Sequence, residues 1–484
     1  MKELSELIQQ YAESNLINNL SGVLDGKSQR ILISGLKGAQ DSFVLAGLHN
    51  KNPFTNLFIA NDKEEAAYFQ NSLDNLLPNQ SIQFFPDSFK RPMFFEELNR
   101  TNILQRTEVI NKIALSSIDE RIIVTYPEAL FEKVVSPDVL GKQKIILEKG
   151  ETLDIDTIIE VMVSYGFKRV DFVYEPGQFS IRGGIVDIFS YGIEWPYRIE
   201  LFDDEVENIR AFNPTTQLSI RNIQKVSIIP NVNSEFSQDE KVSLLKILPE
   251  DSLVWIKDYD FFLDQVQKCF ETAKEFSSQY MEDNEELKQA LDQRSFIYPN
   301  EITNDLENLN QILFKKGDVK DSFSYEQTLG ASPQPNFNKN FKLLIEDLNN
   351  NTSKGYTNYL FTENVKQIER FYNIFEDLNA NVQFIPINKG LHSGFIDHEL
   401  KLACYTDHQI FQRFHKYSLR KGFTKEQALN LKMLRELRPG DYITHIDHGI
   451  GKYSGLEKIN INGHVQESLR IFYKNKDESN NLFR

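Results

Sequence analysis

Short apolar runs alternate with helical patterns along the first 130 residues of the chain. The runs are RILISG (30–35), NLFIAN (56–61), IQFFPD (82–87) and IIVTYP (122–127). Apolar strands that alternate with amphipathic helices are typical of βαβ units, which build an open parallel sheet. The pattern therefore predicts an α/β domain over residues 1–130.

The hydrophobic pattern changes in residues 131–225, where strands follow one another closely with turns between them. VDFVYEPGQFSIRGGIVDIFS and YRIELFDDEVENIRAF show this spacing. It predicts a small antiparallel α+β domain. Helical patterns return in residues 226–331, which we expect to complete the first domain, so that the α+β domain is an insertion.

A βα rhythm resumes in residues 341 to about 415, with the apolar runs NYLFTEN (358–364), VQFIPIN (382–388) and KLACYTD (401–407). It predicts a second small α/β domain over residues 332–418. Residues 419–435 are charged and helical in pattern, and we interpret them as a connector. Residues 436–484 are all strand and turn and resemble the start of a small β-barrel, which we expect to stop before it closes. The whole chain is thus predicted to be an α/β multidomain protein.

Composition and charge narrow the class of protein. The 484 residues carry a net charge of −16, which argues against a chain that binds nucleic acid over its whole surface. The two cysteines, Cys269 and Cys404, are far apart, which excludes a thiolate zinc site and a disulfide framework and fits the cytoplasm. No apolar run reaches the length of about 18 residues that a membrane span needs.

SGLKGAQDS (34–42) lies between an apolar strand and an apolar helix, as a phosphate-binding loop does. A working P-loop reads G-x-x-x-x-G-K-[ST], but here Gln40 replaces the second glycine and Asp41 replaces the lysine. Replacing an ammonium by a carboxylate reverses an interaction of about 4 kcal/mol per charge pair at about 4 Å. We therefore predict a degenerate P-loop that binds no nucleotide, formed by Gly35, Gly38, Gln40, Asp41 and Ser42.

A large aromatic residue stands out on a charged strand face. Period-two alternation places Arg198, Glu200 and Phe202 on one face, and Arg182 in the preceding strand is expected nearby. An aromatic flanked by arginines is typical of a protein-binding hot spot. The alternative is that Phe202 tucks under a loop while the arginines pair with Glu200 or Asp204. Periodicity alone favours neither.

No catalytic or metal-binding arrangement stands out in the sequence. His445, Asp447 and His448 lack an evident fourth ligand, and HGIG fits a turn between strands better than a metal site. No Ser/His/Asp arrangement is identifiable. We therefore predict no catalytic residue and no metal.

Two stretches resemble known domains. YEPGQFSIRGGIVDIFSYGIEWPYRIELFDDEVENIRAFNPTTQLS (174–219) resembles the domain shared by the excision-repair protein UvrB and the bacterial transcription-repair coupling factor, Mfd. LRPGDYITHIDHGIGKYSGLEKI (437–459) resembles the RNA polymerase-interacting domain of the coupling factor, which is related to CarD. Both signatures in this order resemble the N-terminal part of the coupling factor family.

The resemblance implies two protein partners. In the family, the UvrB-like domain binds UvrA through two arginines and a phenylalanine, which correspond to Arg182, Arg198 and Phe202. The polymerase module pairs a strand edge with the RNA polymerase β subunit. The matching positions here are Leu456, Glu457, Lys458 and Ile459.

The resemblance also implies that this chain is an adaptor rather than an enzyme. The family is an ATP-dependent DNA translocase, and its motor, with the ATP, Mg²⁺ and DNA contacts, is expected to follow residue 484. We expect no cofactor in this chain, no membrane contact, and a monomer that recruits UvrA to stalled polymerase. The alternatives are a nucleotide-dependent UvrB-like helicase or damage-recognition subunit, against which Gln40 and Asp41 argue, and a purely transcriptional regulator.

Overall fold

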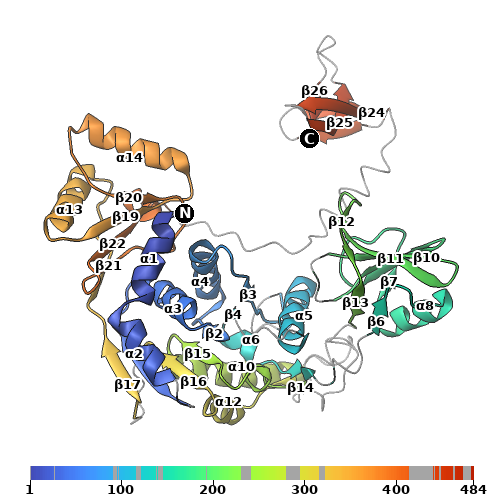
Figure 1. Ribbon diagram of the computed structural model, residues 1–484, viewed down its shortest axis with the longest axis horizontal. Helices are drawn as coiled ribbons and strands as arrows, with labels where there is room; N and C mark the ends of the chain where they lie inside the picture. Colours follow the sequence, from blue (N-terminus) through green and yellow to red (C-terminus); the bar gives the residue numbers. More distant parts are fainter. Residues whose placement is uncertain are drawn as a thin grey trace.

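The computed structural model describes residues 2–24, 26, 28–90, 95, 98–115, 121–137, 139, 145–191, 193, 195–229, 241–279, 295–315, 322–413, 440, 442–445, 449–461, 464–472 and 481–483. Figure 1 shows several separate sheets with helices packed on them. The predicted mixed α/β fold with a parallel sheet is confirmed. No helix in these residues is both long enough and apolar enough to cross a membrane.

The largest sheet has seven strands, all parallel, in the order β17-β1-β16-β15-β2-β4-β3. Four of these strands, β1, β2, β3 and β4, are the apolar runs identified in the sequence. The bounds are Arg30–Ser34 (β1), Asn56–Ile59 (β2), Ile82–Phe84 (β3), Ile122–Thr125 (β4), Leu253–Ile256 (β15), Asn310–Leu313 (β16) and Tyr325–Thr328 (β17). The sheet thus combines strands from both sides of residues 145–228, whose strands form other sheets.

Helices cover the parallel sheet and bury its central strands on both faces. Strands β2, β4, β15 and β16 are buried at every position, as expected for a parallel sheet. The helices associated with this part of the chain are α1 (Lys2–Ala12), α2 (Asn15–Leu24), α3 (Gln40–Lys51), α4 (Lys63–Leu76), α5 (Arg100–Leu115), α6 (Pro127–Leu130), α9 (Leu244–Ile247), α10 (Tyr259–Gln279) and α12 (Pro299–Leu306).

The second sheet has six strands in the order β12-β11-β10-β9-β8-β7, antiparallel except for β7 and β8. Helix α8 (Ile155–Ser164) packs on one face through Ile158 and Met162 (Figure 1). The strands are β7 (Lys168–Arg169), β8 (Gln178–Arg182), β9 (Ile185–Phe189), β10 (Tyr197–Phe202), β11 (Glu205–Phe212) and β12 (Ser219–Ile223). Two short pairs lie outside this sheet, β6 (Ile145–Glu148) with β13 (Lys225–Ile228), and β5 (Val134–Val135) with β14 (Lys241–Val242).

The third sheet has five strands in the order β18-β21-β22-β19-β20. The βα rhythm predicted β19 (Thr357–Phe361), β20 (Ile385–Ile387) and β22 (Leu402–Thr406), but not the antiparallel pair β18 (Ala331–Pro333) and β21 (Phe395–Asp397). Its helices are α13 (Phe341–Ser353), α14 (Val365–Asp377) and α15 (Asp407–Ile410). This sheet shares an apolar core with the first, because the Phe43 ring lies 5.3 Å from Phe395 and 6.1 Å from Phe361.

The C-terminal strands form an antiparallel sheet in the order β23-β24-β25-β26. They are β23 (Tyr442–His445), β24 (Gly449–Ile461), β25 (His464–Phe472) and β26 (Asn481–Phe483). The predicted partial barrel stays a prediction. The predicted connector, 419–435, and the residues Asp447 and His448 lie outside the described residues.

Candidate functional sites

Asp187 organises the charged face of the six-stranded sheet. Strand pairing places Arg198 directly opposite Asp187, which itself lies in the apolar strand IVDIF. The Arg198 guanidinium forms a bidentate pair with the carboxylate, with Nε 2.7 Å from Oδ1 and Nη2 2.9 Å from Oδ2. Arg182 pairs with the same carboxylate through Nη2. Asp187 is fully buried. Its carboxylate therefore orients both guanidinium groups from inside the domain.

Further contacts hold each arginine in place. Arg198 donates to the Gln217 side-chain oxygen at 3.0 Å and lies over the Phe212 ring at 4.3 Å. The hydrogen bonds to Asp187 raise the pKa of Arg198, so its charge persists at every physiological pH. Arg182 lies over the Phe172 ring at 4.5 Å. Two guanidinium charges against one carboxylate leave this cluster with a net positive charge.

The pairing of these arginines with Glu200 or Asp204, the alternative raised from the sequence, is wrong. Glu200 instead pairs with Arg210 on the neighbouring strand. The sequence does hold one indication of the correct partner, because Asp187 is the single charged residue in the apolar strand IVDIF. Local alternation did not reveal it because the register between two strands decides which side chains meet.

Phe202 ends strand β10 and is 71% exposed, so it does not tuck under a loop. The strand turns back through Asp203, whose φ is +50°, and Phe202 faces Glu205 across the hairpin. Asp tolerates this left-handed conformation, which two-residue hairpin turns require. An exposed aromatic at a rigid hairpin is a suitable anchor for a pocket on a partner protein. Arg198 is mostly buried and Arg182 is about one-third exposed, with side-chain exposures of 15% and 34%.

The glycine loop is in contact with another part of the same chain. Gly35 and Gly38 have φ values of +85° and +53°, as the tight turn requires. The first helical turn that follows has no side-chain cap, and the Ala39 amide donates to the Ser393 carbonyl at 3.0 Å. In a P-loop such a helix start binds phosphate. Here the backbone of residues 393–394 lies at this position.

Both residues that depart from the P-loop pattern bind protein groups. Gln40 donates to Asp397 at 2.8 Å, and Asp397 also accepts from the Tyr11 hydroxyl at 2.9 Å. Asp41, which is buried, forms an ion pair with the partly buried Lys257. Burial alone would lower the pKa of Lys257, but the carboxylates of Asp41 and Glu65 outweigh burial and raise it. The contact with segment 391–397 could not be predicted from the sequence, because the two segments lie about 350 residues apart along the chain.

The positions matched to the polymerase interface lie in the long strand β24. Residues 452–461 pair with β25, but β23 pairs only with residues 449–452. Leu456, Glu457, Lys458 and Ile459 therefore lie where one edge of β24 has no partner strand among the described residues. An unpaired strand edge offers backbone donors and acceptors to a second protein.

Known families match two parts of the chain. The model of the UvrB interaction domain matches residues 145–234, which contain the Asp187 face, and the model of the CarD-like/TRCF RID domain matches residues 437–480, which contain β24. The transcription-repair-coupling factor of Bacillus subtilis (strain 168) is 25% identical over 95% of this chain and 44% of its own length. Those of Staphylococcus epidermidis and Staphylococcus aureus are each 22% identical, over 96% and 92% of this chain and 45% and 44% of their own lengths.

The fold and these sites define a class: a multidomain α/β chain that carries a UvrB interaction domain and a CarD-like domain. Within that class, the predicted resemblance to the transcription-repair coupling factor is confirmed by matches over nearly the whole chain. The chain spans a little under half the length of these relatives.

Proposed function

We propose that this chain is a non-catalytic adaptor that recruits UvrA to RNA polymerase stalled at DNA lesions. The observation that carries the proposal is the exposed Phe202 ring on the same sheet as two arginines fixed by buried Asp187. This face lies in the segment that matches the UvrB interaction domain. The relatives' name, transcription-repair-coupling factor, joins the two processes that such an adaptor connects.

The chemistry of the face fits a partner with an apolar pocket and carboxylates around it. Phe202 presents a large apolar area that is released from water on binding, worth about 2 kcal/mol or more for a buried aromatic. Arg182 and Arg198 are already oriented by Asp187, so little conformational entropy is lost when they meet an acidic partner. The proposed partner at this face is UvrA.

The second proposed contact is strand pairing between the open edge of β24 and the RNA polymerase β subunit. Residues 453–461 have the extended length that such pairing needs. We assign no ATP or Mg²⁺ to this chain and expect it to act as a monomer. The contacts of Ala39, Gln40 and Asp41 with protein groups support the proposal that the glycine loop holds no nucleotide.

Direct binding of UvrA to the Phe202→Ala variant tests the first contact. The exposed ring contributes little to folding, so the variant should fold normally and bind UvrA about 30-fold more weakly. Val163→Ala is the matched control, because Val163 is a 60% exposed apolar residue on α8, which covers the opposite face of the sheet. Equal UvrA affinity of Phe202→Ala and wild type would remove the UvrA assignment.

Amide hydrogen exchange with and without RNA polymerase tests the second contact. Strand pairing should slow exchange in residues 453–461, because the free amides of β24 become hydrogen-bonded. Strand β12 is an internal control, since it is also an edge strand but lies in the UvrB-like sheet. Slower exchange in β12 with no change in β24 would contradict the proposed polymerase contact.

A further inference from the structure

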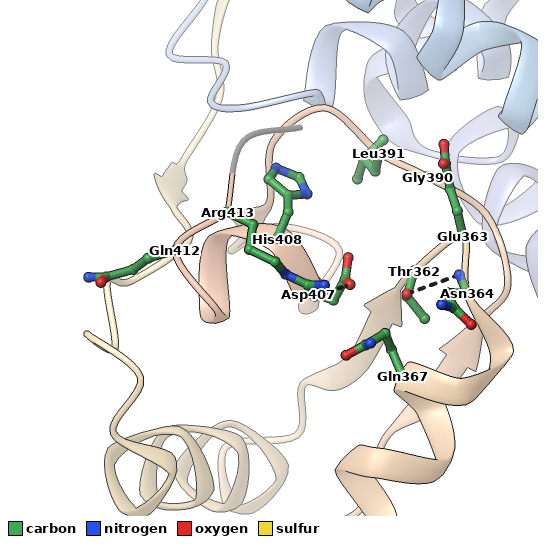
Figure 2. A pocket seen from close by; sticks show the side chains of 10 residues that line it. All are labelled: Thr362, Glu363, Asn364, Gln367, Gly390, Leu391, Asp407, His408, Gln412 and Arg413. Atoms are coloured by element: carbon green, nitrogen blue, oxygen red, sulfur yellow. Dashed lines mark hydrogen bonds and ion pairs between the residues drawn. The ribbon is translucent and has the colours of Figure 1, made fainter. Parts of the chain in front are cut away.

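A cavity of about 700 Å³ opens at one edge of the five-stranded sheet (Figure 2). Its lining comes from the segments that follow three parallel strands. Thr362 and Glu363 follow β19, Gly390 and Leu391 follow β20, and Asp407 and His408 follow β22. Strands β20 and β22 both pair in parallel with β19, so their carboxyl ends meet at this edge.

The order of these strands explains why a crevice forms there. The chain runs from the central strand β19 through α14 to β20 on one side, and then returns past β19 to β22 on the other side. Connections that leave two adjacent parallel strands in opposite directions leave a crevice between them. In open α/β sheets this switch point is the usual place for a ligand.

The start of α14 argues against a phosphate as the natural ligand of the cavity. The first amides of α14 are already bonded within the chain, because Asn364 accepts from the Lys366 amide at 3.0 Å and from the Gln367 amide at 2.8 Å. The carboxylate of Glu363 lies immediately before this helix. A phosphate would therefore find a negative charge near the start of α14, where two of the first amides already bond to Asn364.

Two hydrogen-bond acceptors in the cavity lining, Glu363 and Gln367, have no partner of opposite character among the described residues. The Glu363 carboxylate lies directly over Gly390, where an added Cβ would be 2.3 Å from its Oε1, and it forms no ion pair with any described residue. Gln367 Oε1 is buried and accepts no hydrogen bond within the part of the chain that the structure describes. The charge of Asp407 is matched by Arg413, 2.7 Å away, so the Glu363 charge is left unmatched.

We propose that this cavity binds a small organic cation that carries an amine or guanidinium group. The cation replaces solvent beside the exposed Glu363 carboxylate and bonds to Gln367 Oε1 once the Gln367 side chain turns toward the cavity. Leu391 and Thr362 line the cavity and are held in place by burial. They would contact the aliphatic part of such a ligand. This inference gives the residues 332–418 a role of their own, independent of UvrA and polymerase binding.

Calorimetric titration of the full chain with agmatine tests the proposal. Agmatine has an amine, a guanidinium and no acid group, and it should bind saturably at one site. Glu363→Gln keeps the side-chain shape and should weaken binding about tenfold, since one charge-assisted hydrogen bond is lost. Glu369→Gln is the matched control, because it makes the same charge change at an exposed position of α14 outside the cavity.

A second variant separates binding from folding. Gln367→Leu should weaken agmatine binding while the thermal unfolding temperature stays unchanged or rises, because it removes a buried acceptor that has no partner. Three results would overturn the proposal: no saturable binding of agmatine, equal weakening by Glu363→Gln and Glu369→Gln, or saturable binding of ATP that Glu363→Gln strengthens. The last result would identify an anion site.

Discussion

At the scale of single residues, Asp187 has the largest influence on the proposed UvrA-binding face. It is fully buried and balances parts of two guanidinium charges. Without its negative charge, Arg182 and Arg198 would repel each other and leave their present positions. A residue that itself has no exposed surface therefore determines the shape of an exposed site.

Replacing Asp187 by asparagine should destabilise the six-stranded sheet by about 3 kcal/mol, because one partner of a buried ion pair is lost. Amide hydrogen exchange in β9 and β10 measures this loss as a local opening free energy. Glu200→Gln is the control, since its pair with Arg210 is partly exposed and should contribute no more than about 1 kcal/mol. Similar costs for the two variants would contradict the role assigned to Asp187.

Because of Lys257, the stability of the first sheet should vary with pH in the alkaline range. Its pKa is raised in the folded chain because Asp41 and Glu65 outweigh the effect of burial. Its contribution is therefore complete below the unfolded pKa of about 10.4 and is lost as the pH rises through the folded pKa. Lys257→Met should cost about 2 kcal/mol near pH 8, and this difference should shrink above about pH 10.

Thermal unfolding of the wild type and Lys257→Met from pH 8 to 11 measures this difference. Lys315→Met is the control, because Lys315 also pairs with an aspartate but is 66% exposed. The control should differ little from the wild type across the whole range. A Lys257→Met difference that stays constant up to pH 11 would show that the ion pair has another role.

At the scale of elements, the glycine loop and segment 391–397 act as one structural unit. The Ser393 carbonyl accepts from the start of α3, while Asp397 accepts from Gln40. The Tyr68 and His392 rings stack at 4.1 Å and extend this contact to α4. The backbone of residues 393–394 thereby occupies the place at which a working P-loop binds phosphate.

Alanine at Gly38 tests this contact directly. The substitution should cost about 2 kcal/mol or more, because φ is +53° and the new Cβ would lie 2.4 Å from the Gly394 carbonyl oxygen. Gly22→Ala is the control, since no atom lies within 4 Å of its added Cβ in helix α2, and it should stabilise the chain by up to about 1 kcal/mol. Thermal unfolding curves should therefore shift in opposite directions. A shift of both variants in the same direction would contradict the packed loop.

At the scale of the whole molecule, the sequence predicted what depends on local pattern. Apolar runs of four to six residues identified β1, β2 and β4, because strands covered on both faces of a parallel sheet are mostly apolar. Alternation predicted the face of Phe202, because it depends on one strand only. The pair β18–β21 and the contact between Phe43 and Phe395 were missed, since each joins segments far apart along the chain.

The proposed adaptor carries its two binding elements on separate sheets. The proposed UvrA-binding face belongs to the six-stranded sheet, and the proposed polymerase-binding edge belongs to the C-terminal sheet. Substitution at Phe202 should therefore affect one partner without affecting the other. This independence is what distinguishes an adaptor from a regulator that uses only its C-terminal module.

Capture of UvrA on immobilised RNA polymerase tests this claim most directly. We predict that polymerase retains UvrA only when the chain is added, that Phe202→Ala stays bound to polymerase but no longer retains UvrA, and that Val163→Ala behaves as the wild type does. Equal retention of UvrA by Phe202→Ala and wild type, or no retention of the chain by polymerase, would contradict the account.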